Sequence, residues 1–435
     1  DGTLYIRGSG EMTDWKYSSD VPWYSNRSKI RKVKIGRGVT NVGKYAFTDC
    51  DSLTSVTIGN SVTSIGEHAF YNCSSLTSVT IPDSVTSIAE DAFRGCSKLT
   101  SITIPDSVTS IGEEAFSNCS KLTSMTIPSS VTSIGGGVFV GCNSLARIDV
   151  EENNKQYCSI NGVLFNKDKT KIVCYPEGKT DSTYTIPDGV TNIGENAFYG
   201  CSSLTSVTIP DSACGIGKSA FAECTKLVSI KIPSNVNSVM AYAFSGCTNL
   251  KNVYITDIDA WCIINFSTDS SNPLRYANNL YLNDVLVTDV VIPNGVITID
   301  PYLLSCSSLK SVVIPNSVRW IKEGAFLGCS NLTSVEIPKN VRGIESGAFY
   351  NCSSLTNITI PGENLQWIDA RMFWGCSSLN RVTILSGVGC IDDWGFARCN
   401  SLTSITIPKS MKSIHIGAFN GCSSLADIYY EGSES

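Results

Sequence analysis

The sequence predicts a repeat solenoid, in which short parallel β-strands stack on one another as successive rungs. Three observations predict it: a phrase of 23 residues recurs, apolar residues alternate over a short strand within it, and a proline follows the strand in most copies. A fixed period between about 20 and 50 residues is typical of stacked units that contact only their neighbours. Within each of three runs, the isoleucine at the end of the strand recurs every 23 residues, with one step of 24. These isoleucines are Ile58, Ile81, Ile104 and Ile127, then Ile186, Ile209 and Ile232, then Ile314, Ile337, Ile360, Ile384 and Ile407.

Each copy begins with the strand. In the copy that starts at Leu76, Val79 and Ile81 alternate toward the interior. Ser78 and Thr80 must therefore face outward on the strand side. The spacing L-x-x-L-x-L of the three apolar residues is that of the strand segment of a leucine-rich repeat.

The rest of the copy returns along the opposite side. Pro82 ends the strand, because proline has no N–H to donate to a ladder. Val85 and Ile88 follow on the return side, and the Ala-Phe-x-x-Cys spacing of residues 92–96 predicts one or two helical turns. We therefore expect a right-handed superhelix of short parallel β-strands joined by short helical turns.

Fourteen of the nineteen cysteines occupy one repeat position. Stacking would set neighbouring members about 5 Å apart, but equivalent side chains point the same way, and runs of five and three cannot pair completely. We interpret them as a buried ladder of free thiols filling a tight corner. The ladder comprises Cys50, Cys73, Cys96, Cys119, Cys142, Cys201, Cys224, Cys247, Cys306, Cys329, Cys352, Cys376, Cys399 and Cys422. The state of the others stays open: Cys158, Cys174, Cys214, Cys262 and Cys390.

The period is absent at the start of the chain and breaks at two insertions. The first residues, with Trp15 and Trp23, are expected to form a short hairpin that closes the first rung. The first insertion carries two strand-like runs around a turn at residues 167–169, which predicts a β-hairpin. The second predicts an aberrant rung with a bulge. Insertions often map to the binding face of a solenoid, although a kink that only changes curvature explains them as well.

The expected segments of one continuous solenoid are a β cap (1–30), repeats (31–150), the hairpin insertion (151–180), repeats (181–255), the irregular insertion (256–290) and repeats (291–435).

Composition excludes some classes of function. Lys plus Arg total 33 and Asp plus Glu 39, so the net charge is -6 and there is no basic stripe for nucleic acid. No apolar run approaches the ~18–20 residues needed to span a membrane. The chain opens at Asp1 without a methionine, which we interpret as trimming that hides any targeting segment.

The phrase Cys-Ser-Ser-Leu-Thr-Ser-Val-Thr-Ile-Pro-Asp-Ser-Val-Thr-Ser-Ile at residues 73–88 closely resembles the BspA-like class of leucine-rich repeats, and the match covers nearly the whole chain. The opening segment 2–12 and the Asp-Ala-Trp-Cys stretch at 259–262 resemble pieces found with such repeats in bacterial surface proteins. The resemblance implies an extracellular or cell-surface location and adhesion to host proteins or neighbouring cells. It transfers no catalytic motif and names no ligand.

The outward strand face is mostly Ser and Thr, as at Ser55/Thr57 and Ser78/Thr80. Either these residues only keep the strand face soluble, or the face forms hydrogen bonds to a glycan or a polypeptide. Larger or charged residues interrupt it, and Tyr and Arg are residue types that concentrate binding energy at interfaces. Drift in a decayed repeat explains these residues equally well. The candidates for ligand binding on this face are Arg147, Asp149, Lys231, Tyr254, Glu336, Arg381 and Tyr429.

Large aromatic residues gather on the return and turn sides of the later repeats. We add Trp320, Trp367, Trp374 and Trp394 to the candidates, because aromatic side chains at positions expected to be exposed are costly unless something covers them. They either stack on sugar rings or a partner protein, or clasp each other across the gap at Gly343.

No constellation for catalysis, a metal or a cofactor emerges. The two histidines, His68 and His415, lie far apart in the array. No phosphate-binding loop, zinc-spaced cysteine pair or calcium loop is present. We therefore expect a protein that is not an enzyme.

The sequence thus predicts a non-enzymatic, secreted or cell-surface bacterial protein that binds a host or neighbouring-cell protein or glycan through the solenoid surface. The alternative is a structural spacer that presents another domain. Neither a nucleic-acid partner nor a membrane-spanning segment is expected, and the pattern favours no particular oligomeric state.

Overall fold

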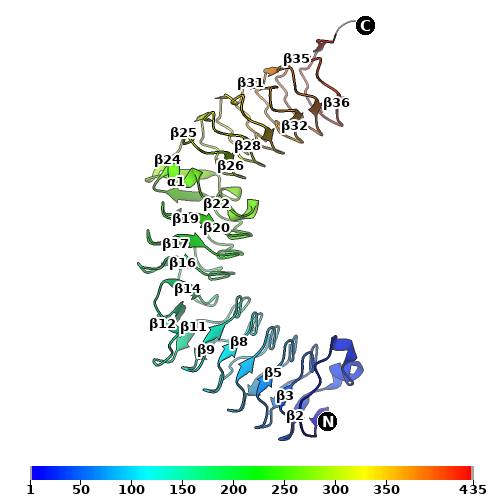
Figure 1. Ribbon diagram of the computed structural model, residues 1–435, viewed down its shortest axis with the longest axis vertical. Coiled ribbons are helices and arrows are strands. Elements are labelled where there is room, and N and C mark those ends of the chain that lie inside the picture. Colours follow the sequence, from blue (N-terminus) through cyan, green and yellow to red (C-terminus); the bar gives the residue numbers. More distant parts are fainter. Residues whose placement is uncertain (1, 433–435) are drawn as a thin grey trace. The chain divides into compact units, whose positions relative to one another are not determined.

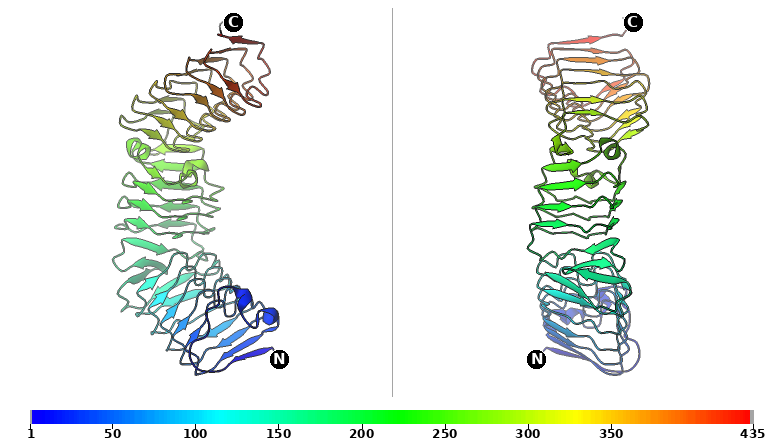
Figure 2. Two further views of the ribbon diagram at one scale, coloured as in Figure 1. Left: turned by 45° about the vertical axis from the view of Figure 1, so that its right-hand side comes forward. Right: turned by 90° about the vertical axis from the view of Figure 1, so that its left-hand side faces the viewer.

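The computed structural model of the protein describes residues 2–432. The described chain divides into two units. The N-terminal unit runs to Thr205 and includes Ile216–Lys226 and Ser245–Cys247; the C-terminal unit comprises Ser206–Gly215, Leu227–Phe244 and the chain from Thr248 onward. Within each unit the strands stack as the rungs of a parallel solenoid, which confirms the predicted fold class (Figures 1 and 2).

The outward strands of the N-terminal unit pair in register one period apart. Ser55 pairs with Ser78 and Val56 with Val79, with the valines buried and the hydroxyl residues outside, as predicted. The strands on this side are β1 (Thr3–Ile6), β2 (Lys32–Ile35), β4 (Ser55–Thr57), β6 (Ser78–Thr80), β9 (Ser124–Ile127), β11 (Arg147–Val150) and β15 (Thr183–Thr185). The return side carries β3 (Asn41–Val42), β5 (Ser64–Ile65), β7 (Ser87–Ile88), β8 (Ser110–Ile111), β10 (Ser133–Ile134) and β16 (Asn192–Ile193), and β18 (Gly215–Ile216) lies at the division between the units.

The C-terminal unit repeats the arrangement. Its outward strands are β17 (Ser206–Thr208), β19 (Ser229–Ile232), β21 (Asn252–Ile255), β23 (Asn279–Leu282), β25 (Asp289–Val291), β27 (Ser311–Val313), β29 (Ser334–Val335), β31 (Asn357–Ile360), β33 (Arg381–Ile384), β35 (Ser404–Ile407) and β37 (Asp427–Tyr430). Its return strands are β20 (Ser238–Val239), β22 (Asn265–Phe266), β26 (Thr298–Ile299), β28 (Trp320–Ile321), β30 (Gly343–Ile344), β32 (Trp367–Ile368), β34 (Cys390–Ile391) and β36 (Ser413–Ile414).

Two ladders of equivalent side chains fill the core. Phe70 stacks on Phe47 and on Phe93 with ring centroids 5.3 and 5.2 Å apart. Beside them, the Cys73 Sγ donates to the Phe47 carbonyl oxygen one rung back, at 3.1 Å. The cysteines are free thiols, as predicted, and burial raises the pKa of the fully buried members Cys73 and Cys96 well above the ordinary thiol value. The five cysteines outside the ladder are free as well.

The predicted helical turns are wrong. In the copy after Ile65, His68 and Asn72 have positive φ values of 55° and 56°, which an α-helix does not accommodate. The His68 and Phe70 N–H groups donate to carbonyl groups of the next rung, at 3.0 and 2.8 Å, rather than back to their own segment. Stacking therefore replaces the intrahelical hydrogen bonds, and this edge is a series of turns.

The N-terminal hairpin is also a wrong prediction. β1 pairs in parallel with β2 as one more rung, and the segment between them holds the 3₁₀ helices η1 (Ser18–Asp20) and η2 (Tyr24–Lys29). A connection of this length favours a crossover over a tight hairpin turn. Trp23 covers the end of the phenylalanine ladder: it stacks on Phe47 at 5.7 Å and donates its indole N–H to the Ala46 carbonyl oxygen at 2.7 Å.

The first insertion contains the predicted hairpin, formed by β13 (Val163–Asn166) and β14 (Lys171–Cys174). A third strand, β12 (Tyr157–Ile160), pairs antiparallel with β13 around Asn161-Gly162. Asn-Gly is the residue pair that favours a two-residue hairpin turn, so this strand was detectable from the sequence.

The second insertion keeps two rung strands, β22 and β23, and adds elements that the sequence interpretation missed. They are α1 (Ile258–Cys262), the 3₁₀ helices η3 (Asp269–Ser271) and η4 (Pro273–Arg275), and the short antiparallel strand β24 (Val285–Leu286). Asp257 caps α1 by accepting from the N–H groups of Asp259 and Ala260. Trp261 of α1 is buried and donates its indole N–H to the Leu303 carbonyl oxygen at 2.9 Å.

Candidate binding surface

Two of the predicted candidates on the strand face lie side by side in the C-terminal unit. Lys231 of β19 and Tyr254 of β21 are register partners in the parallel sheet. The next position in this column is Tyr281 of β23, whose ring stacks on that of Tyr254 with centroids 4.7 Å apart and planes 18° from parallel. Tyr281 was missed because the insertion places it 27 residues after Tyr254 instead of 23, although Asn-Leu-Tyr-Leu at 279–282 mirrors Asn-Val-Tyr-Ile at 252–255.

The column continues into an exposed apolar groove. Leu286 of β24 is the antiparallel register partner of Tyr281. Val285 is 70% exposed and Val291 of β25 is 65% exposed, and Val291 pairs with Val313, another exposed valine, in β27. These residues line an open groove of about 950 Å³. Contiguous exposed apolar side chains of this kind typically mark an interaction site.

Arg147 and Asp149 form a pair of their own in the N-terminal unit. The Arg147 guanidinium lies 2.7 Å from an Asp149 carboxylate oxygen; the Arg147 side chain is exposed and that of Asp149 is partly exposed. The turn at Gly162 packs against Arg147, and together with Lys179 these residues border a shallow hollow. An exposed ion pair of this kind contributes little to stability.

Glu336, Arg381 and Tyr429 are exposed, as predicted, but lie singly. Arg381 is the register partner of Asn357, and Tyr429 that of Thr406. Within the described residues, none of the three side chains forms an ion pair or a ring contact.

Trp320 and Trp367 are both exposed on return strands. The Trp320 ring lies over Gly343 of the next rung, where a Cβ would collide with it, and the Lys322 ammonium lies 5.4 Å from the ring centroid. Within residues 2–432, Trp320 makes no ring contact with Trp367, which is 55% exposed. Trp320 and Trp367 therefore do not contact each other across Gly343, contrary to one of the two alternatives; Trp320 alone fills the space over Gly343.

Trp374 and Trp394 lie on the turn edge and are half-buried. Trp374 stacks on Tyr350 with centroids 4.5 Å apart, and the Arg398 guanidinium lies 4.8 Å from its ring centroid on the same edge. Trp394 has a left-handed backbone with φ of 61°, and its ring packs against Gly417. Contacts within the chain therefore cover much of both rings, so neither is a free platform.

One cluster of titratable groups on the C-terminal unit was also missed. His415 Nδ1 lies 3.0 Å from Asp392 Oδ1 and 3.8 Å from Asp393 Oδ1. His415 follows Asp392 by one period, so adjacent rungs bring the two side chains together. His415 is exposed and the two aspartates are partly exposed, and contact between the imidazole and the carboxylates of the adjacent rung accounts for the geometry.

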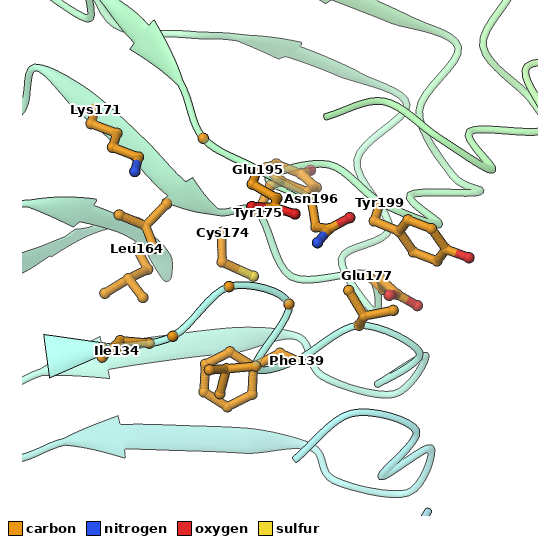
Figure 3. A pocket seen from close by; sticks show the side chains of 17 residues that line it. Ile134, Phe139, Leu164, Lys171, Cys174, Tyr175, Glu177, Glu195, Asn196 and Tyr199 are labelled. Atoms are coloured by element: carbon orange, nitrogen blue, oxygen red, sulfur yellow. The ribbon is translucent and has the colours of Figure 1, made fainter. Parts of the chain in front are cut away.

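A second recess lies inside the N-terminal unit, between the turn after β10 and strand β14 (Figure 3). It is a cavity of about 170 Å³ to which Lys171, Cys174 and Glu177 contribute side chains. Burial raises the pKa of the Glu177 carboxyl to about 7, while the Gly141 N–H, which donates to Glu177 Oε1 at 2.6 Å, opposes that change. The sequence interpretation missed this group, because nothing in the hairpin pattern marks Glu177 as buried.

No helix in the described part of the chain has the length and apolar content needed to cross a membrane.

Comparison with known proteins identifies the repeat. The family profile described as "BspA type Leucine rich repeat region (6 copies)" matches residues 23–146, 64–176, 174–272, 270–367 and 343–433. No curated protein matches the chain.

Solved structures agree with the family assignment. A leucine-rich repeat protein from Eubacterium ventriosum is 29% identical, with a TM-score of 0.60, over 80% of this chain and 90% of that one. One from Bacteroides ovatus is 25% identical, with a TM-score of 0.50, over 92% of each chain. The pneumococcal vaccine antigen PcpA shares the fold at 21% identity, with a TM-score of 0.51, over 89% of this chain and 95% of that one. The chain, with its 23-residue rungs and its ladders of phenylalanine and cysteine, belongs to the BspA-type leucine-rich repeat family.

Proposed function

We propose that this protein is a non-enzymatic, secreted or cell-surface binding protein that holds a host or neighbouring-cell protein or glycan against the strand face of its C-terminal unit. The column Lys231–Tyr254–Tyr281 and the groove that follows it carry this proposal. The extracellular location rests on the family resemblance, since BspA-like repeats occur mainly on surface and secreted proteins.

The chemistry of the column suits a partner with both polar and apolar groups. The stacked rings of Tyr254 and Tyr281 are already ordered, so binding costs them little side-chain entropy. Tyrosine supplies a large apolar area and a hydroxyl, which is why it is frequent among residues that dominate interface energy. Lys231 adds a positive charge at one end, and the groove at Val291 adds apolar area at the other.

A binding screen of this chain against immobilised matrix proteins and glycans tests the proposal. We expect a partner to be found, and Tyr254→Ala with Tyr281→Ala to weaken its binding at least about tenfold, because hot-spot residues contribute that much or more. Tyr17→Ala, which removes an exposed tyrosine from the N-terminal unit, is the matched control and should bind as the parent does. A spacer would bind nothing, and equal binding by the double variant would place the contact elsewhere.

A further inference from the structure

Rung stacking is interrupted inside the N-terminal unit. The phenylalanine ladder runs through Phe116 to Phe139, with centroids 6.2 Å apart. Tyr175, at the equivalent position of the next rung, stacks on Phe198 at 5.3 Å, and within the described chain it makes no ring contact with Phe139. The cavity of about 170 Å³ occupies this break.

The break leaves backbone donors without partners. In intact rungs the equivalent N–H groups donate to the next rung, as Glu114 does to the Gly136 oxygen at 3.0 Å and Phe116 to the Val138 oxygen at 3.1 Å. One rung further on, the N–H groups of Gly137 and Phe139, both in the cavity wall, have no acceptor among the described residues. N–H groups without an acceptor are rare inside folded proteins, so these two groups need water or another polar molecule in the recess as their acceptor.

The remaining charged groups make the cavity rich in donors. Lys171 forms no ion pair within residues 2–432, and Figure 3 shows its ammonium group turned toward the recess from β14. Glu195 is neutralised by Lys218, whose ammonium lies 3.1 Å from its carboxylate. Glu177 is already engaged by the Gly141 N–H. Among the described wall groups, those left without a partner are the Lys171 ammonium, the two backbone N–H groups, the Asn196 side-chain amide and the Tyr199 hydroxyl. All of them can donate a hydrogen bond, and together with the ammonium charge they favour an anionic oxygen ligand.

We propose that this cavity binds a small carboxylate compound, with its carboxylate held by Lys171 and the N–H groups of Gly137 and Phe139. The volume equals that of about five or six water molecules, so the ligand has the size of a dicarboxylic acid or a single sugar acid. Leu164, Val173 and Phe139 supply the apolar wall that contacts its carbon skeleton.

A free acid and the terminal acidic sugar of a glycan share this chemistry. The three glycines at 135–137 form one wall of the cavity. Side chains at these positions would project toward the cavity or the neighbouring rung, so glycine keeps this wall open. Gly136 lines the recess, and a Cβ added there would lie 3.5 Å from Glu195 Oε2, in ordinary van der Waals contact, so a larger side chain at this position would take up space in the recess.

Isothermal titration of the whole chain with succinate, with glucuronate and with a glucuronate-terminated oligosaccharide tests the assignment. We expect saturable binding of at least one probe. Binding of the oligosaccharide as well as glucuronate indicates a glycan end, and binding of succinate or glucuronate alone indicates a free acid.

Two variants act on the site by different routes. Lys171→Gln should weaken binding about tenfold or more, because a charge-assisted hydrogen bond is lost. Gly136→Leu should abolish binding by filling the cavity. Lys121→Gln, at an exposed lysine of the same unit, is the control and should bind as the parent does. Circular dichroism and the thermal midpoint establish that each variant is folded.

Absence of binding by all three probes at millimolar concentration would overturn the proposal, with water alone as the occupant. Binding that survives both Lys171→Gln and Gly136→Leu would overturn it too. Neither result bears on the tyrosine column, because that surface belongs to the C-terminal unit and is tested by Tyr254 and Tyr281.

Discussion

Glu177→Gln should stabilise the N-terminal unit at alkaline pH and leave it unchanged in acid. The pKa of the Glu177 carboxyl rises from 4.5, its ordinary value, to about 7 in the folded protein. The native state therefore holds a proton that the unfolded state releases between these values. Stability is fully present below about pH 4.5 and falls as the pH rises through 7, because the buried carboxyl must then ionise.

The size of this effect follows from the two pKa values. At about 1.36 kcal/mol per pH unit, the difference amounts to about 3 kcal/mol at pH 8, or roughly 300-fold in an opening equilibrium. Glutamine keeps the Oε1 acceptor for the Gly141 N–H but cannot ionise. The free energy of unfolding of the variant should therefore not fall between pH 4.5 and pH 8 as that of the parent does.

Hydrogen exchange measured by mass spectrometry reports this locally. Peptides that cover residues 134–142 and 171–178 are compared between parent and variant at equal pH, so that intrinsic exchange rates cancel outside the substituted position. We expect up to about 300-fold slower exchange in Glu177→Gln at pH 8 and nearly equal exchange at pH 4.5. A variant that exchanges faster than the parent at pH 8 would show that the Gly141 hydrogen bond outweighs burial, and would refute the reasoning.

Other substitutions test the ladders. Phe93→Ala should lower the free energy of unfolding by about 3–5 kcal/mol in urea denaturation, since a buried ring between two stacked neighbours is lost, whereas Thr80→Ala on the exposed face should change it by less than about 0.5 kcal/mol. A thiol reagent should label Cys214 first in the native protein and count nineteen thiols in denaturant; fewer would disprove the free-thiol ladder. Trp374→Ala should cost about 1 kcal/mol through its lost stacking, and Trp367→Ala less than about 0.5 kcal/mol; equal losses would contradict the contacts described here.

The regular rungs were predictable because each copy repeats one local pattern. Val79 and Ile81 are buried, Ser78 and Thr80 face outward, and Cys96 joins the thiol ladder, all as the alternation and the period indicate. Prediction failed where stacking overrides local preference. Residues 92–96 have a helical spacing, yet the N–H groups of Phe93 and Gly95 donate to carbonyl oxygens of the next rung, at 2.8 Å each, so this segment forms no helix.

Prediction of the candidate site was weaker. The period identified Lys231 and Tyr254 on one face, because residues one period apart occupy equivalent positions. It missed Tyr281 because the second insertion shifts the count, and it expected Trp374 to be exposed, whereas Tyr350 lies against its ring. Glu177 lies in the first insertion, where the 23-residue period is interrupted, so the period gives no indication of its environment.

The amino-acid sequence by itself determined the solenoid, its outward hydroxyl face and its free-thiol ladder, because a repeated apolar pattern admits one way of burying itself against identical neighbours. Tertiary structure alone decided where the stacking stops and what the interruption exposes. Glu177, Gly137 and Phe139 line a recess because the rung that follows Gly137 and Phe139 does not stack on them as regular rungs do. That interruption depends on how the first insertion packs. A burial of this kind is set by contacts between segments far apart in the chain, which no local pattern encodes.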